Sequence, residues 1–200
     1  SNIWANKAPK HGNWVEVQAY ECCNPTTTTT TSTTTPTTTT TTTLGSSSIK
    51  YGYLYNFFAV DDARGIAPDG WHVPTDTEFE TLRLYVASQG WNYDGTTDVG
   101  TDEVNKQGKA LATDYGWEPY EETGTVGNTD YPAIRNISGF SVLPGGGRYD
   151  DGNFNLIGYS GYWWSSTEES TGYAFYRSLT YSGPNVYRGF DTEVDGFSVR

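Results

Sequence analysis

The chain has 200 residues, which is enough for one ordinary domain and an additional segment but not for two large domains. Its formal net charge of −12 excludes nucleic acid as a favourable partner, because a phosphate backbone would be repelled. Aromatic residues make up 16% of the chain, charged residues only 18%, and there are 23 glycines, a composition typical of turn-rich domains built mainly from strands. No apolar run approaches the ~18 residues of a transmembrane helix, so we expect no membrane insertion.

Residues 1–25 form a first segment, in which residues 13–20 (NWVEVQAY) alternate between polar and apolar side chains in the manner of a strand. A short strand is not stable alone, so it should pair with the main domain, with a neighbouring copy or with an upstream region. We therefore predict an anchor or assembly segment. The adjacent Cys22 and Cys23 would form a strained bond with each other, which favours free thiols or bridges to other chains.

Residues 26–48 form a second segment that consists almost entirely of threonine and serine. Such tracts are typical of extended, O-glycosylated stalks, and at a rise of about 3.1 Å per residue the eighteen residues 26–43 would reach roughly 55 Å. A plain flexible linker is the simpler alternative. The predicted glycosylation sites are Thr26, Thr27, Thr28, Thr29, Thr30, Thr31, Thr33, Thr34, Thr35, Thr37, Thr38, Thr39, Thr40, Thr41, Thr42 and Thr43.

Residues 49–200 carry the signals of a folded domain. A capping box at Thr75 and Glu78 predicts a helix that ends near Gly90, with Phe79, Leu82 and Val86 facing inward and Leu84 and Tyr85 broadening the apolar stripe. A shorter helix is expected over residues 104–112. Strands are expected over residues 161–166, 173–180, 186–190 and 196–200, with a turn at residues 182–185. Helices that precede strands, without βαβ alternation, indicate the α+β class.

Five blocks in this domain resemble the Fibrobacter succinogenes major paralogous domain family. They are residues 51–56 (YGYLYN), 67–76 (APDGWHVPTD), 138–146 (SGFSVLPGG), 161–168 (GYWWSSTE) and 196–200 (GFSVR). The resemblance implies a C-type-lectin-like fold with one or two helices and a twisted antiparallel sheet. It also implies kinship with formylglycine-generating enzymes and with the retroelement-diversified tropism proteins of phages, whose ligand contacts lie in the C-terminal strands and loops.

Catalysis is not expected. Formylglycine generation requires active-site cysteines, and residues 49–200 contain none. His72 lies between Trp71 and a Val-Pro pair, where a packed structural role is more common than that of a general base. The adjacent carboxylate pairs are more typical of solvated loops than of a glycosidase site. We therefore predict no enzyme activity.

No cofactor is expected, with one open case. Asp94, Asp98, Asp102 and Glu103 lie in a loop whose oxygen atoms could hold a structural calcium ion. The loop has no EF-hand spacing, and the Glu-Pro-Asn signature of calcium-dependent lectins is absent from the chain. Sugar binding through a bridging calcium ion is therefore not expected.

The binding hypothesis depends on tyrosines between residues 153 and 190, which are mixed with Asn, Ser and Gly as in antibody paratopes. Alternation places Phe175 and Leu179 on one face of the 173–180 strand, taken as the core face, and leaves Tyr176 and Ser178 outward. At least one of Trp163 and Trp164 should be structural, because neighbours in a strand point to opposite faces. The predicted ligand-binding residues are Tyr159, Tyr176, Tyr181, Asn185 and Tyr187.

Together these features predict a non-catalytic adhesin or receptor-binding module, displayed on a stalk by a phage fibre or an extracellular bacterial surface protein. Its partner would be a host-surface glycan or protein, and its location the exterior of a cell or virion. The alternative is a self-assembling structural subunit of a glycosylated filament or virion decoration, which would associate through residues 1–48.

Overall fold

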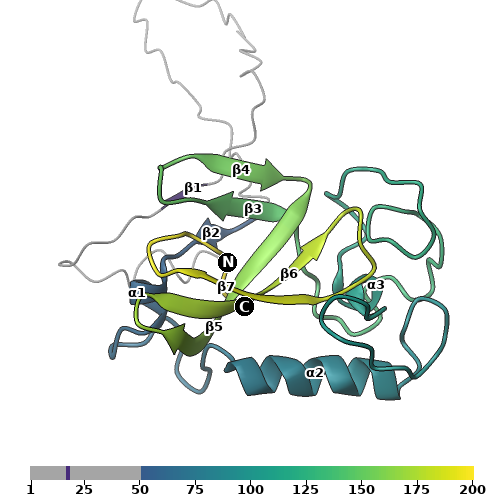
Figure 1. Ribbon diagram of the computed structural model, residues 1–200, viewed down its shortest axis with the longest axis horizontal. Coiled ribbons are helices and arrows are strands. Elements are labelled where there is room, and N and C mark those ends of the chain that lie inside the picture. Colours follow the sequence, from purple (N-terminus) through teal and green to yellow (C-terminus); the bar gives the residue numbers. More distant parts are fainter. Residues whose placement is uncertain (1–16, 19–50) are drawn as a thin grey trace, which may run out of the picture.

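A curled, mixed sheet of five strands forms the centre of the molecule, and the helices lie around it (Figure 1). The computed structural model describes residues 17–18 and 51–200. The strand order is β4-β3-β5-β6-β7, and a separate two-stranded sheet joins β1 to β2. The strands are β1 (Val17–Gln18), β2 (Tyr53–Leu54), β3 (Gly145–Arg148), β4 (Phe154–Ile157), β5 (Ser160–Ser170), β6 (Tyr173–Thr180) and β7 (Tyr187–Thr192). The helices are α1 (Phe57–Val60), α2 (Asp76–Ser88) and α3 (Gly108–Leu111). The α+β class is confirmed.

Helix α2 begins and ends where its sequence predicts. The Thr75 hydroxyl accepts a hydrogen bond from the Glu78 amide, and the Glu78 carboxylate accepts one from the Thr75 amide. Gly90 follows the C-cap with φ of +70°, a conformation that favours glycine. The prediction that Leu84 and Tyr85 broaden the apolar stripe is wrong, however. Leu84 and Tyr85 are exposed, because the inward face is instead continued by two buried residues, Arg83 and Ala87.

The second predicted helix is shorter than expected. Of residues 104–112, only α3 is helical, and the residues before it form a turn held by Asn105. The Asn105 side-chain amide donates to the backbone oxygens of Thr101 and Val186, at 2.8 and 2.9 Å. Side-chain bonds of this kind compete with helical hydrogen bonds, which explains why the helix does not begin earlier.

The sheet is mixed, where the resemblance implied an antiparallel one. β3 pairs with β5 in parallel, and the other neighbours in the large sheet are antiparallel. Neither β3 nor β4 was predicted. Residues 196–200 were expected to form a strand, but they make only isolated bridges, in which Gly196, Phe197 and Ser198 pair with Arg148, Tyr55 and Trp163. The segment crosses between three elements and does not run along any one of them, so no continuous ladder forms.

Apolar cores cover both faces of the sheet. The first contains Phe79 and Val86 from α2 together with Trp163 and Leu179. The second contains Phe57 and Val60 from α1 together with Trp164, Ala174 and Phe197. Trp163 and Trp164 therefore point to opposite faces, as expected, but both are buried, at 3% and 0% exposure.

This two-sided burial corrects the expected division of β6. The Phe175–Leu179 face is not the only core face, since Ala174 on the opposite face is fully buried. Tyr176 is half-buried and packs against the second core, and Ser178 is only 3% exposed. The residues predicted to point into solvent instead line a hollow in a partly covered face.

Two residues of the N-terminal segment pair with the main domain. Val17 and Gln18 of β1 lie opposite Leu54 and Tyr53 of β2, so the pairing partner of these two residues is the main domain. The predicted glycosylation sites and the rest of residues 1–48 lie outside the described residues. In the part of the chain that is described, none of the helices is sufficiently long and apolar to cross a membrane.

Candidate functional site

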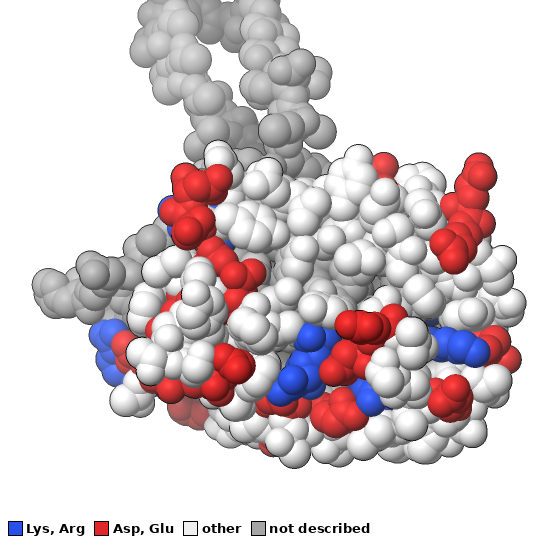
Figure 2. All heavy atoms as spheres, viewed as in Figure 1, with Lys and Arg blue, Asp and Glu red and all other residues white. Residues whose placement is uncertain are grey.

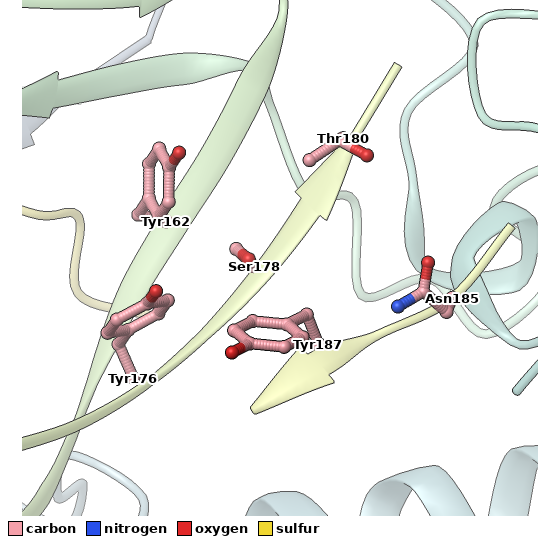
Figure 3. Close-up of a pocket in the computed structure, with 6 residues that line it drawn as sticks. All are labelled: Tyr162, Tyr176, Ser178, Thr180, Asn185 and Tyr187. Carbon is pink, nitrogen blue, oxygen red and sulfur yellow. The ribbon is translucent and has the colours of Figure 1, made fainter. Parts of the chain in front are cut away.

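A small pocket opens on the sheet face that carries the second core (Figure 3). Its volume is about 280 Å³, at the lower end of the range of ligand pockets. Three tyrosines and three smaller polar side chains surround it, and none of them is charged. The lining residues are Tyr162, Tyr176, Ser178, Thr180, Asn185 and Tyr187.

Strand register brings these side chains together. Ser178 of β6 lies between Tyr162 of β5 and Tyr187 of β7, because it is the register partner of both. Residues two apart in a strand share a face, so Tyr176 and Thr180 flank Ser178 on the same side. The small Ser178 side chain thus lies between larger neighbours, and a hollow forms above it (Figure 3).

The turn before β7 supplies the polar end of the pocket and is held from below. Asn185 donates from Nδ2 to the Asp102 carbonyl oxygen at 2.9 Å. Next to it, the Val186 amide donates to Oδ1 of the buried Asn105 at 2.8 Å. These bonds orient the Asn185 side chain before any ligand arrives, which reduces the entropy that binding would cost.

The aromatic wall is packed at its base and free at its rim. The Tyr176 ring lies 5.7 Å from that of Tyr162 and 5.2 Å from that of Phe197, between ring centres, and burial raises its pKa above the ordinary value. Tyr187 is 6.4 Å from Tyr176 but 40% exposed. Tyr176 is thus a fixed wall, and Tyr187 is the ring that a ligand can reach from solvent.

Gly189 permits this arrangement, and Gly189→Ala is expected to deform the pocket. An added Cβ would lie 2.6 Å from the Tyr176 ring and 2.9 Å from that of Tyr187, closer than carbon atoms approach. Tyr187, which is partly exposed, can rotate away, whereas the packed Tyr176 ring must shift against its neighbours, so we expect a cost of about 1–3 kcal/mol in the free energy of unfolding. Urea unfolding and near-ultraviolet circular dichroism would measure both effects. In a Tyr187→Ala background the same substitution should cost less, and an equal cost would show that Tyr187 does not bear the strain.

Uncharged residues fill the upper middle of the face shown in Figure 2, while acidic side chains lie along its left side and at its upper right, and acidic and basic side chains are mixed across its lower part. A pocket without a charged lining, in a chain of net charge −12, favours neutral ligands over anionic ones.

Comparison with known families gives one match. The family model described as Fibrobacter succinogenes major domain matches residues 5–200. The chain belongs to this family. The match also includes the threonine tract and most of the N-terminal segment, beyond the residues 49–200 that carried the resemblance. Neither the curated proteins nor the solved structures contain a match to the chain.

The five predicted ligand-binding residues of this Fibrobacter succinogenes major domain fall into two groups. Tyr176, Asn185 and Tyr187 line the pocket. Tyr159 and Tyr181 belong to a separate aromatic cluster, in which the ring centre of Tyr181 lies 5.1 Å from that of Tyr159 and 5.3 Å from that of Tyr120. The pocket therefore draws on three of the five, and the remaining two form an adjoining surface of partly exposed tyrosines.

Three lining residues are not among the predicted site residues. Ser178 and Thr180 share the β6 face of Tyr176, so period-two alternation groups them with it, but the paratope-like pattern singles out tyrosines and asparagine and not small hydroxyl residues. Tyr162 lies on β5, and only the pairing with Ser178 reveals that it faces the same hollow.

Other candidate groups in the major domain have structural partners. His72 is exposed, not packed as expected, and its Nε2 lies 2.9 Å from Glu78 Oε1 in the capping box of α2. Asp94 forms an ion pair with Lys106 at 2.6 Å, and Asp98 accepts a hydrogen bond from the Gly100 amide. The described residues contain no cluster of three His, Cys, Asp or Glu side chains that is arranged for a metal ion.

Proposed function

We propose that this Fibrobacter succinogenes major domain is a non-catalytic binding module and that the tyrosine pocket holds its ligand, a glycan or a protein side chain. The observation that carries the proposal is the pocket itself: three strands and one turn place six uncharged side chains with aromatic faces and hydrogen-bonding tips around one hollow. Other polar groups such as Asp94 and His72 have ion-pair partners, whereas this set surrounds an open hollow.

The chemistry of the lining suits one sugar unit. Tyr187 presents an aromatic face to the apolar C–H side of a sugar ring, and the ring edge can exchange hydrogen bonds with Asn185, Thr180 and the tyrosine hydroxyls. A volume of about 280 Å³ limits the site to a small group. A longer glycan would place its next unit outside the pocket, on the rim.

In this proposal the domain is a C-type-lectin-like head, the threonine tract is a glycosylated stalk, and the module acts as an adhesin or receptor-binding protein outside the cell or on a virion. The α+β class, the family membership and the acidic surface support this picture. The family match through the threonine tract supports a fixed association of the two segments.

One observation favours the alternative of self-assembly. β4 is an edge strand of the large sheet, and its residues Phe154 and Leu156 are 43% and 41% exposed. An edge strand with exposed apolar side chains can act as a template for a strand of another chain. A filament subunit could therefore pair through β4 and still carry the pocket on its other strands.

A glycan array probed with the full chain is the direct test of the proposed function. We expect binding to a restricted set of neutral glycans that is unaffected by a chelator of divalent cations, because no metal takes part in the proposed contact. Indifference to all glycans, combined with no binding to host-surface proteins in a pulldown, would contradict the binding function. Concentration-dependent assembly that Phe154→Lys prevents would instead support the structural alternative.

A further inference from the structure

The turn after β7 brings two pairs of carboxyl groups close together. Asp195 lies near enough to Asp191, at the end of β7, for the two carboxyl groups to interact, and Glu193 lies similarly near Glu168 of β5. Asp195 is 3% exposed, and its Oδ1 has no hydrogen-bond donor among the described residues; the same holds for Oε1 of Glu193. Two ionised carboxylates in contact at a buried position repel each other strongly. A proton or a cation must therefore lie between Asp191 and Asp195.

A proton fits the surroundings better than a cation does. The described residues offer no third His, Cys, Asp or Glu ligand arranged with this pair for a metal ion. The groups that act on Asp195 are Asp191 from β7, Asp150 from the β3–β4 turn and the hydroxyl of the adjacent Thr192. Burial and the negative charge of Asp191 raise the pKa of Asp195 to about 6.

Other charged groups around the turn do not neutralise the pair. Arg148 of β3 exchanges backbone hydrogen bonds with Gly196, but its guanidinium acts on Asp151. On the other side of the turn, Glu193 faces Glu168 and Asp61, which are also acidic. The turn is therefore surrounded by negative charge, which agrees with the acidic side of the face in Figure 2.

The carboxyl pair is connected to the wall of the pocket. Asp191 lies on the same β7 face as Tyr187, two residues beyond Gly189, and it acts electrostatically on Tyr149 and Tyr176. Tyr149 in turn interacts with Tyr162. A displacement of Asp191 would therefore act directly on Tyr176 and, through Tyr149, on Tyr162, and both of these tyrosines line the pocket.

We propose that the turn formed by residues 192–195 is a proton-operated latch on the tyrosine pocket. With one proton shared between Asp191 and Asp195, the turn is held against the end of β7 and the aromatic wall is fixed. When that proton leaves to bulk water, the two carboxylates repel each other, the turn separates from β7 and the wall loosens. The step is a reversible protonation and requires no other reactant. Ligand affinity should therefore be higher in mildly acidic surroundings, a consequence that rests on the proposed function.

Hydrogen exchange of the full chain, without ligand, tests the latch itself. The amides of Glu193, Asp195 and Gly196 donate to Gly172, Thr192 and Arg148 at 3.1, 3.0 and 2.7 Å, so they report directly on closure. After correction for the intrinsic rate, protection over residues 187–196 should fall about tenfold from about pH 5 to about pH 7.5. In Asp195→Asn the amide donates permanently to Asp191, and protection should stay high at both values.

Asp150→Asn is the matched control, because it removes a neighbouring negative charge and leaves the carboxyl pair in place; its protection should depend on pH as in the unsubstituted chain. Asp191→Asn is a second variant that should also abolish the dependence. The latch is refuted if protection changes equally in all variants. It is also refuted if millimolar Ca²⁺ restores protection near pH 7.5 in the unsubstituted chain, since a cation would then bridge the pair. No ligand enters this experiment, so its failure and the failure of the proposed function can be told apart.

Discussion

Tyr187→Ala is expected to weaken ligand binding by about 30-fold or more while the fold stays intact. A central tyrosine in a binding site typically contributes about 2 kcal/mol or more when it is truncated to alanine. Tyr187 is 40% exposed and belongs to neither buried core, and its ring lies 6.4 Å from that of Tyr176, so its removal should leave the core unchanged. Titration calorimetry with the best glycan from the array, together with a thermal melt, would measure both quantities.

Tyr173→Ala provides the control. Tyr173 is 42% exposed and packs against Phe190 on the other face of the same two strands, away from the pocket. It matches Tyr187 in residue type, exposure and strand environment, so its loss should leave affinity within about twofold. Equal losses of affinity in both variants would remove the pocket from the proposal. Tyr176→Ala is a poorer test, because Tyr176 packs against Trp164 and Phe197 and its removal would open a cavity.

Helix α2 was predictable because its signals are local. The residues that begin it, Thr75 and Glu78, bond to each other, and Gly90 ends it through its own backbone preference. The set of helix residues that is buried could not be predicted from local signals. Arg83 is buried because its guanidinium reaches Glu80 and the Val99 carbonyl oxygen, and the second of these partners lies in a separate loop. No pattern within the helix reveals that contact.

Strand β3 could not be predicted, since three of its four residues are glycines, which rarely form strands. Their reason is close packing. A Cβ on Gly147 would lie 3.0 Å from the Phe197 ring, and one on Gly146, where φ is +64°, would lie 2.1 Å from the Asn155 carbonyl oxygen. The sheet therefore requires glycine here for contacts with residues distant in sequence. Alternation within a strand gives faces, but it gives no information about such neighbours.

Those pocket residues that can be recognised from the pattern of one strand or turn were predictable. Tyr176 and Tyr187 follow from the aromatic pattern of β6 and β7, and Asn185 from the turn between them. Their mutual approach depends on register and on Gly189, and the separation of Tyr159 and Tyr181 into another cluster depends on Tyr120, about 40–60 residues away. Two-sided burial of the sheet, which turned an outward face into a hollow, also requires knowledge of where α1 and residues 196–200 lie.

Asp76→Asn is expected to destabilise the domain by about 3–5 kcal/mol, because it leaves a buried arginine without its counter-charge. Asp76 opens α2, and Oδ1 lies 2.6 Å from Arg177 Nη1 of β6 and 3.0 Å from Arg188 Nε of β7. Arg177 is 1% exposed. The carboxylate therefore joins the helix to two strands, and chemical unfolding at neutral pH would measure the loss.

Asp94→Asn is the control for the clamp formed by Asp76, Arg177 and Arg188. Asp94 pairs with Lys106 at the same 2.6 Å, but both side chains are partly exposed. Its loss should cost less than about 1 kcal/mol. Arg177→Met in the Asp76→Asn background should recover part of the stability, because it removes the unpaired charge. If Asp76→Asn costs no more than Asp94→Asn, the clamp does not hold the helix to the sheet.

The interaction of Asp76 with the two arginines also determines whether stability rises or falls as the pH is lowered. Burial alone would raise the pKa of Asp76, but the hydrogen bond from Arg188 and the charge and hydrogen bond of Arg177 outweigh it and hold the pKa below its usual value. A carboxyl with a lowered pKa contributes stability above its unfolded value of about 3.9, and loses it as the pH falls through the folded value. Asp195 acts in the opposite sense, since its raised pKa stabilises the fold in acid and that contribution is lost as the pH rises through about 6. The unfolding free energy of the Asp76→Asn variant should therefore no longer decline steeply at low pH. That of the Asp195→Asn variant should no longer decline as the pH rises toward about 6. The two substitutions thus distinguish the contacts that hold the helix to the sheet from those that hold the turn to the pocket.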